Sequence, residues 1–240
     1  MDFPWTDAEL TVEVERAVAK YWSARLGQAT RQQASGGSDA GRRSEVTGGL
    51  HMDGFTDIVV DLVVKAGFDL AEIRFKSNVE LPGFYRSTKK WDLVVSRAGR
   101  LCCAIELKSQ VGPSFGNNFN NRTEEALGTA VDLWRAFQQG LVGSAQPFLG
   151  YFFLLEDTDG SNKPVRVAKT PFETDPVFVD SSYAKRYEIL CQRMVLERHY
   201  TSAALLLARA DGAGRYSEPN ADVSFGRFAR ALFGHLVGCV

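Results

Sequence analysis

The sequence predicts an α/β fold, in which a mixed central β-sheet is flanked by α-helices. Segments with helical spacing of apolar residues alternate along the chain with strand-like segments. The 240 residues, 45% of them hydrophobic, are enough for one full core. No long linker divides them, so we expect a single domain over residues 1–240.

The N-terminal region predicts two helices. Thr6 and Glu9 have the spacing of a capping box, and apolar residues then recur at helical spacing to about Leu26. Asp53 is the expected N-cap of a second helix, which an apolar face continues until Gly67 ends it.

The segment between these helices, residues 27–50, is rich in Gly, Ser, Gln and Arg. This composition predicts a flexible basic loop, and it contains Arg42 and Arg43. At the other end of the chain, residues 210–240 form an extension whose role the sequence leaves open.

Strand-like segments occupy the middle of the chain. Residues 71–76 alternate between apolar and polar, and two apolar runs follow at 92–96 and 101–108. The four residues 97–100, which include a glycine, join the two runs and predict a hairpin.

The second half continues the alternation of helices and strands. A glycine- and asparagine-rich loop precedes a helix that we expect Thr123 to cap. A strongly apolar run at 148–155 predicts a central strand, and a long, weakly patterned connection follows it at 157–182. The remaining expected elements are a helix at 183–197, a strand at 203–208 and a helix at 225–237.

Charge and cysteine usage exclude several classes of protein. The net charge is −1, so nucleic-acid contacts have to come from local basic clusters. The four cysteines include no Cys-x-x-Cys pair and the three histidines are scattered, which disfavours a zinc site. We find no signal peptide, membrane-spanning stretch, phosphate loop or dinucleotide fingerprint. We therefore expect a cytoplasmic protein that is not a nucleotide-dependent metabolic enzyme.

The residues with the clearest chemistry are Asp92, Glu106 and Lys108. Glu106 and Lys108 are two residues apart in a predicted strand, so their side chains share one face. A carboxylate and an ammonium on an otherwise apolar strand are costly unless they bind something. Asp92 on the preceding strand can add a second carboxylate, and such hard oxygen ligands suit Mg²⁺.

The hairpin register decides whether Asp92 joins this face. Directly paired residues of an antiparallel hairpin share a face, and pairing of Asp92 with Glu106 requires a three-residue loop at 98–100 or a bulge nearby. A two-residue loop without a bulge would put Asp92 on the opposite face. Short motifs of this kind also arise by chance, and a surface ion pair on an edge strand has the same spacing.

Two neighbouring features favour a DNA-cleaving site. Residues 74–108 contain eight positive and three negative side chains, as phosphate binding requires, although a solvated basic face would look alike. The segment 112–122 contains four asparagines and an arginine, which can hydrogen-bond base edges. The alternative for this segment is a turn in which asparagine only accepts left-handed conformations.

Several motifs, in order, closely resemble the XhoI-type type II restriction endonucleases over roughly residues 44–197. The matching segments are Gly49-Leu-His-Met-Asp-Gly-Phe55, Leu81-Pro-Gly-Phe-Tyr-Arg-Ser-Thr-Lys-Lys-Trp-Asp92, Ala104-Ile-Glu-Leu-Lys-Ser109, Val111-Gly-Pro-Ser-Phe-Gly-Asn-Asn-Phe-Asn-Asn-Arg122 and Arg186-Tyr-Glu-Ile-Leu-Cys191.

This resemblance implies a PD-(D/E)xK nuclease with a restriction-endonuclease-like core, which acts as a homodimer on double-stranded CTCGAG. It would cut after the first cytosine of each strand and leave four-nucleotide 5′ overhangs. Asp92, Glu106 and Lys108 match the catalytic pattern, with Trp91 where the pattern often has proline. Asp53 is a candidate for a further catalytic acid, or it is only an N-cap.

On this basis we expect Asp92, Glu106 and the Leu107 carbonyl to hold Mg²⁺, while Lys108 orients or deprotonates the attacking water. The products would carry 5′-phosphate and 3′-hydroxyl ends, and a separate methyltransferase would protect host DNA. Three alternatives remain: a nuclease of the same superfamily with another specificity, an inactive DNA-binding module and an unrelated metabolic α/β enzyme. The missing phosphate loop, dinucleotide fingerprint and nucleophile elbow disfavour the last. The expected DNA contacts are Arg42, Arg43, Arg86, Lys89, Lys90, Asn117, Asn118, Asn120, Asn121 and Arg122.

Overall fold

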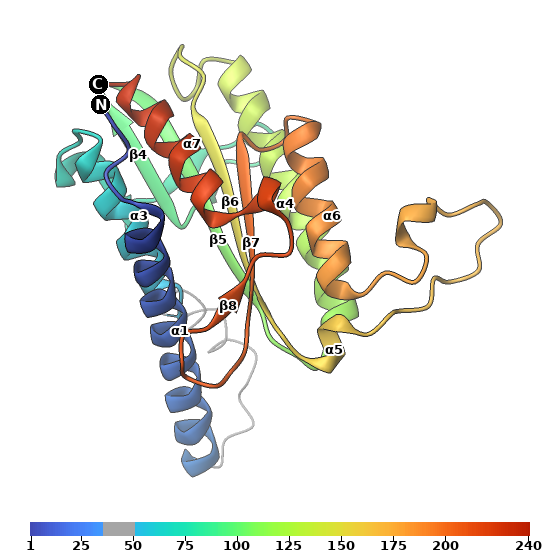
Figure 1. The fold of residues 1–240 in the computed structure, drawn as a ribbon. Coiled ribbons are helices and arrows are strands. Elements are labelled where there is room, and N and C mark those ends of the chain that lie inside the picture. The colour runs from blue at the N-terminus through green and yellow to red at the C-terminus, as the bar shows by residue number, and fades with distance from the viewer. Residues whose placement is uncertain (36–50) are drawn as a thin grey trace.

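Short apolar runs of the sequence form one mixed six-stranded sheet at the centre of the molecule (Figure 1). The computed structural model describes residues 1–35 and 51–240, so Arg42 and Arg43 lie outside the described residues. Along the sheet the strand order is β1-β4-β5-β6-β7-β8. The bounds are β1 Ile73–Phe75, β4 Leu93–Arg97, β5 Arg100–Gln110, β6 Phe148–Glu156, β7 Ser202–Ala208 and β8 Tyr216–Ser217.

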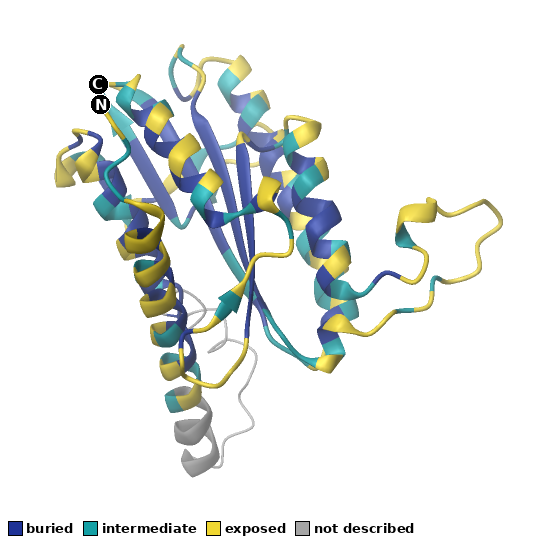
Figure 2. Cartoon of the chain, viewed as in Figure 1, coloured by how far each residue is buried: buried dark blue, intermediate teal, exposed yellow. Residues whose placement is uncertain are grey.

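The direction of the strands changes across the sheet. β5, β6 and β7 run parallel, whereas β1, β4 and β8 pair antiparallel with their neighbours. Eight of the nine residues of β6 are buried, because helices cover both faces of this strand (Figure 2). These observations confirm the predicted α/β class and the central place of the 148–155 run.

Two helical layers enclose the sheet. One core joins its first face to α1 (Asp7–Ser35), α3 (Asp53–Lys65) and α7 (Phe225–Val237). A second core joins the other face to α4 (Phe115–Gln138) and α6 (Tyr183–Leu196). No helix in the described part of the chain is long and apolar enough to cross a membrane.

Three predicted helix boundaries were wrong. α1 runs through Ser35 instead of ending near Leu26, because Ala, Gln and Arg, which favour helix, dominate the next residues. Met52, not Asp53, is the N-cap of α3: its carbonyl accepts hydrogen bonds from the first turn, and Asp53 is the first helical residue.

The third error concerns the segment predicted as an asparagine-rich loop. α4 begins at Phe115, so residues 115–122 are helical and Thr123 is not a cap. Phe115 and Phe119 lie one helical turn apart and pack on Tyr183 and Tyr187 of α6, with ring centroids 6.0 and 5.0 Å apart. Burial of this aromatic pair outweighs the low helix propensity of the asparagines.

The C-terminal extension is part of the core. β8 pairs with β7 at the edge of the sheet, and η3 (Ala221–Val223) leads into α7, whose bounds match the predicted helix. Phe225, Phe228 and Leu232 of α7 are 2% exposed or less. The extension thus covers the face of β6 and β7, a role that the sequence had left open.

The long connection at 157–182 forms an arm that extends away from the body of the molecule (Figures 1 and 2). It contains α5 (Asp159–Asn162) and η2 (Pro176–Phe178). At its base Val165 N donates to Ser181 O (3.0 Å), and the Arg186 guanidinium donates to the Val165 carbonyl (3.1 Å). The arm therefore leaves from a fixed base beside α6.

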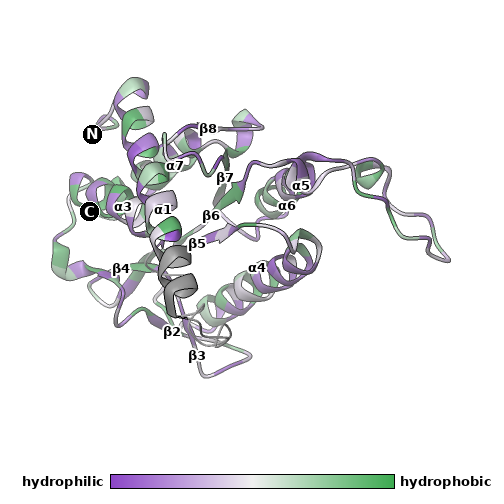
Figure 3. Ribbon diagram, turned by 90° about the horizontal axis from the view of Figure 1, so that it is seen from below, coloured by the Kyte–Doolittle hydropathy of each residue, from purple (hydrophilic) through white to green (hydrophobic). Residues whose placement is uncertain are grey.

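A separate hairpin lies between β1 and β4 in the sequence. Its strands are β2 (Glu80–Pro82) and β3 (Thr88–Lys90), which pair antiparallel. The 3-10 helix η1 (Leu70–Glu72) lies earlier in the chain and leads into β1. Seen from below, the hairpin lies beside α4 (Figure 3), whose Asp132 accepts hydrogen bonds from the hairpin tip.

Candidate active site

A β-bulge sets the register of the hairpin formed by β4 and β5. Arg97 pairs with Arg100, so the loop has two residues, Ala98 and Gly99, both with positive φ (50° and 75°). The register then shifts between Val95 and Ser96. Of the two sequence-based possibilities the bulge is therefore the correct one.

The bulge brings Asp92 to the face of Glu106. Beyond it Leu93 pairs with Ile105, and Asp92 N donates to Ile105 O at 3.2 Å. Ile105 and Leu107 face the core on the side of α3 and α7, as predicted. Asp92, Glu106 and Lys108 consequently lie on the other face of the sheet, toward α4.

The three side chains meet around the Lys108 ammonium. Its Nζ lies 3.3 Å from Asp92 Oδ2 and forms a close ion pair with Glu106 Oε2. The Leu107 N–H donates to Asp92 Oδ2 at 2.8 Å. Because N–H and C=O of one strand residue point to the same side, the Leu107 carbonyl also points toward Asp92, past the end of β4.

Burial and neighbouring charges shift the pKa of each group. Burial raises the pKa of Asp92, and the Glu106 carboxylate raises it further against the effect of Lys108. Burial alone would raise the pKa of Glu106, but Lys108 and Lys89 outweigh it and hold this pKa below its ordinary value. Burial alone would lower the pKa of Lys108, but Glu106 and Asp92 hold it above its ordinary value. Glu106 is thus the firmly ionised acid of the pair.

The donor set fits a hard divalent cation such as Mg²⁺. Glu106 is only 2% exposed, and within the described residues its Oε2 accepts no directed hydrogen bond, although the Lys108 ammonium lies beside it. An ionised, buried carboxylate with spare acceptor capacity is a suitable ligand. No cluster of three or more His, Cys, Asp or Glu ligands occurs in the described ranges, so a metal here would rest on two carboxylates and a carbonyl.

Comparison with known proteins gives this site a context. The family model described as "Restriction endonuclease XhoI" matches residues 31–218. The chain belongs to the XhoI family of restriction endonucleases. It is therefore a type II restriction enzyme, a site-specific deoxyribonuclease.

Three curated relatives agree with the XhoI-family membership. The type II restriction enzyme BstVI of Geobacillus stearothermophilus is 47% identical over 213 residues, 85% of this chain and 95% of the relative. XhoI of Xanthomonas vasicola is 44% identical over 183 residues, 75% and 73% of the two chains. AbrI of Azospirillum brasilense is 46% identical over 158 residues, 65% and 71%. No solved structure matches the chain significantly.

Helix α4 adds a second polar surface to the XhoI-family site. Asn118, Arg122 and Glu125 follow one another at helical spacing on one face. Arg122 pairs with Glu125 at 2.6 Å, and Glu125 lies 3.8 Å from Lys108 Nζ. Our sequence interpretation missed Glu125, because the segment before it was taken as a loop; a helix from residue 115 would have placed Glu125 one turn after Arg122.

Three of the residues predicted to contact DNA have protein partners: Arg122, which pairs with Glu125, and Lys89 and Arg86. Lys89 forms a close ion pair with Glu106 Oε1 and is only 16% exposed, so it lies inside the site. Arg86 Nε donates to Asp132 of α4 at 2.6 Å. Lys90 and Asn117, Asn120 and Asn121 are exposed, and Asn118 is half-buried.

Among the described residues, Asp53 forms no ion pair with the three central side chains. It pairs with Lys76 at 3.4 Å. Asp53 belongs to α3, and α3 covers the face of the sheet opposite to the face that carries Glu106.

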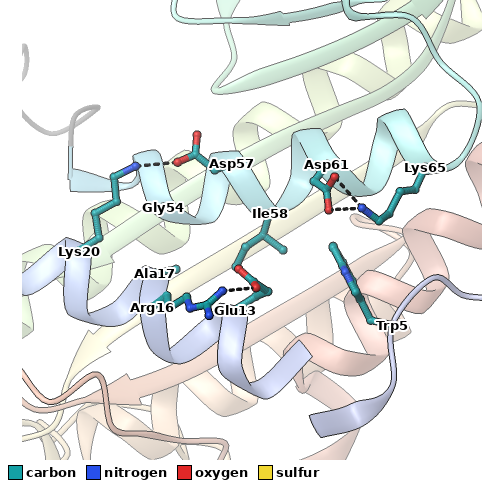
Figure 4. A pocket seen from close by; sticks show the side chains of 10 residues that line it. All are labelled: Trp5, Glu13, Arg16, Ala17, Lys20, Gly54, Asp57, Ile58, Asp61 and Lys65. Carbon is teal, nitrogen blue, oxygen red and sulfur yellow. Dashed lines mark hydrogen bonds and ion pairs between the residues drawn. The ribbon is translucent and has the colours of Figure 1, made fainter. Parts of the chain in front are cut away.

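A surface hollow lies between α1 and α3, and its lining includes none of Asp92, Glu106 and Lys108 (Figure 4). Its charged side chains pair with one another: Arg16 with Glu13, Lys20 with Asp57, and Lys65 with Asp61. The helices are close here, since a Cβ on Gly54 would lie 2.8 Å from the Cα of Ala17. This hollow is best explained as packing of two helices with a solvated rim.

Proposed function

We propose that the chain cuts both strands of double-stranded CTCGAG after the first cytosine, in a Mg²⁺-dependent reaction. The observation that carries this proposal is the meeting of Asp92, Glu106 and Lys108 in a member of the XhoI family. The products would carry four-nucleotide 5′ overhangs with 5′-phosphate and 3′-hydroxyl ends.

The residues of the site divide the work by charge. Asp92, Glu106 and the Leu107 carbonyl would hold the metal, which supplies neutralisation of charge developing on the phosphate and on the leaving oxygen. The Lys108 ammonium faces both carboxylates that would hold the metal. From this position Lys108 orients the attacking water and stabilises the negative charge that the water gains as it loses its proton. Glu125 pairs with Arg122 and lies 3.8 Å from Lys108 Nζ, so it would help to hold both cations in place.

The palindromic target supports a homodimer. Cutting both strands of a two-fold symmetric site needs two copies of the same active site, and a two-fold symmetric dimer presents them in matching orientation. Asn117, Asn118, Asn120, Asn121 and Arg122 would be the base-reading or phosphate-binding groups of each copy, on the first turns of α4. Arg42, Arg43, Arg86 and Lys90 would grip phosphates. Such an enzyme would act in the cytoplasm, beside a separate methyltransferase that protects host DNA.

Digestion of a plasmid with one CTCGAG tests the specificity. We expect linear DNA, cut only with Mg²⁺, whose ends sequence as 5′-TCGA overhangs and rejoin with ligase. A matched plasmid in which one base pair of the site is changed should stay circular, since a mismatched base pair costs about 1–3 kcal/mol.

The controls separate the alternatives. Asp92→Ala should leave the first plasmid uncut. Cutting at another fixed sequence would refute the CTCGAG assignment, whereas cutting without a fixed site would indicate a different kind of nuclease. Binding without cutting by the unaltered chain would indicate an inactive DNA-binding module.

A further inference from the structure

Lys89 places a second ammonium on the carboxylate of Glu106. It contacts Oε1, while Lys108 contacts Oε2, so each oxygen of this buried group faces a cation. Lys89 Nζ also donates to the Lys90 carbonyl (2.7 Å) and lies 5.2 Å from the centre of the Trp91 ring. The catalytic pattern of acid, acid and lysine does not require this second lysine.

The hairpin that carries Lys89 is fixed to the body of the protein. Asp132 of α4 accepts hydrogen bonds from Phe84 N and Tyr85 N, both at 2.8 Å, and from Arg86 Nε. A Cβ on Gly83 would lie 2.7 Å from Asp132 Oδ2, so the hairpin tip lies tightly against this carboxylate. Trp91 N donates to Val79 O (3.0 Å) at the other end. The hydrogen bonds at both ends of the hairpin therefore fix the position of the Lys89 backbone.

The charges of the site balance without any metal. Two carboxylates, Asp92 and Glu106, face two ammonium groups, Lys89 and Lys108, and Glu125 is paired with Arg122. A divalent ion bound to Glu106 would be repelled by the Lys89 ammonium, because that ammonium contacts the same carboxylate. A DNA phosphate brings negative charge and offers the Lys89 ammonium another partner.

We propose that Lys89 is a positioning residue that occupies Glu106 in the DNA-free enzyme and moves to a DNA phosphate on binding, which couples metal binding to DNA binding. Its four-carbon side chain can swing while the backbone of β3 stays in place. Lys108 has no such freedom, because it projects from the central strand β5 between three carboxylates. This inference rests on the proposed function, since it concerns the same metal site.

The test measures Mn²⁺ binding by electron paramagnetic resonance in the absence of DNA. Lys89→Met should bind Mn²⁺ at least about tenfold more tightly than the unaltered chain. The repulsion between a unit charge and a divalent ion a few ångströms away corresponds to more than a tenfold change in affinity, even at the dielectric of a protein surface. Lys89→Arg, which keeps the charge, and Lys169→Met, which changes an exposed lysine on the arm at 157–182, should bind it as weakly as the unaltered chain. Lys89→Gln replaces Lys89→Met if the latter fails to fold.

A duplex whose scissile 3′-oxygen is replaced by methylene provides the second arm, because it keeps the phosphate charge but cannot be hydrolysed. It should tighten Mn²⁺ binding strongly in the unaltered chain and much less in Lys89→Met. Unchanged or weaker DNA-free binding in Lys89→Met would overturn the coupling while leaving the proposed function intact. Absence of Mn²⁺ binding in every variant, with and without DNA, would overturn both.

Discussion

Glu106→Gln and Asp92→Asn are expected to abolish cleavage alike but to change the stability of the metal-free protein in opposite directions. Each removes one of the two carboxylates at the site, so cleavage should fall at least about a thousandfold, equivalent to the several kcal/mol that a bound metal contributes. The stability difference follows from the surroundings of each acid.

Glu106 is stabilised as an anion by the fold, whereas Asp92 is destabilised as one. Two ammonium groups contact Glu106 and lower its pKa, so glutamine would leave Lys89 and Lys108 facing each other and cost about 2–4 kcal/mol. Burial raises the pKa of Asp92, and asparagine can still accept the hydrogen bond from Leu107 N. We therefore expect Asp92→Asn to be as stable as the unaltered chain or more so.

Urea unfolding in the presence of a chelator measures this difference. A lowered pKa in the folded state means that ionised Glu106 contributes stability above its unfolded pKa, which is lost as the pH falls through the folded pKa. The gap between the unaltered chain and Glu106→Gln should therefore narrow in acid. If both variants were equally destabilised at neutral pH, our assignment of the two carboxylates would be wrong.

The largest effect on stability alone is expected for Phe228→Ala in α7. Phe228 is 1% exposed, lies in ring contact with Phe148 and Phe225, and packs where a Cβ on Gly150 would come within 2.9 Å of its ring. Loss of a buried phenylalanine side chain costs about 3–5 kcal/mol, a large share of the roughly 5–15 kcal/mol that stabilises a domain.

Thermal and urea unfolding check this prediction against Arg227→Ala, a change to the exposed neighbour on the same helix. The control should stay within about 0.5 kcal/mol of the unaltered chain. Equal stability of Phe228→Ala and Arg227→Ala would mean that the C-terminal extension does not belong to the core.

The sequence predicted the sheet and the strand that carries Glu106 and Lys108 well because both depend on local patterns. The apolar run of β6 and the two-residue spacing of Glu106 and Lys108 identify strand and face directly. The bulge that brings Asp92 to the same face was one of two possibilities, because a single extra residue in β5 leaves no mark on the apolar pattern.

The features that sequence reasoning missed depend on contacts distant in the chain. The first turns of α4 form because Phe115 and Phe119 pack on α6, and this burial is invisible in a segment rich in asparagine. The ion pair of Lys89 with Glu106 was also missed, because it joins residues 17 positions apart through a separate hairpin. The apolar spacing of residues 55–63 predicts the helix that follows Asp53, but the face of the sheet that this helix covers depends on tertiary packing.

The most direct test of the active-site assignment locates the metal itself. Fe²⁺ in place of Mg²⁺, with ascorbate and peroxide, produces hydroxyl radicals that cut the polypeptide next to the bound ion. The assignment predicts backbone cuts confined to the neighbourhoods of Asp92 and Glu106–Lys108, which Mg²⁺ suppresses and Glu106→Gln abolishes. Cuts concentrated elsewhere, for instance along α1 and α3, would contradict it.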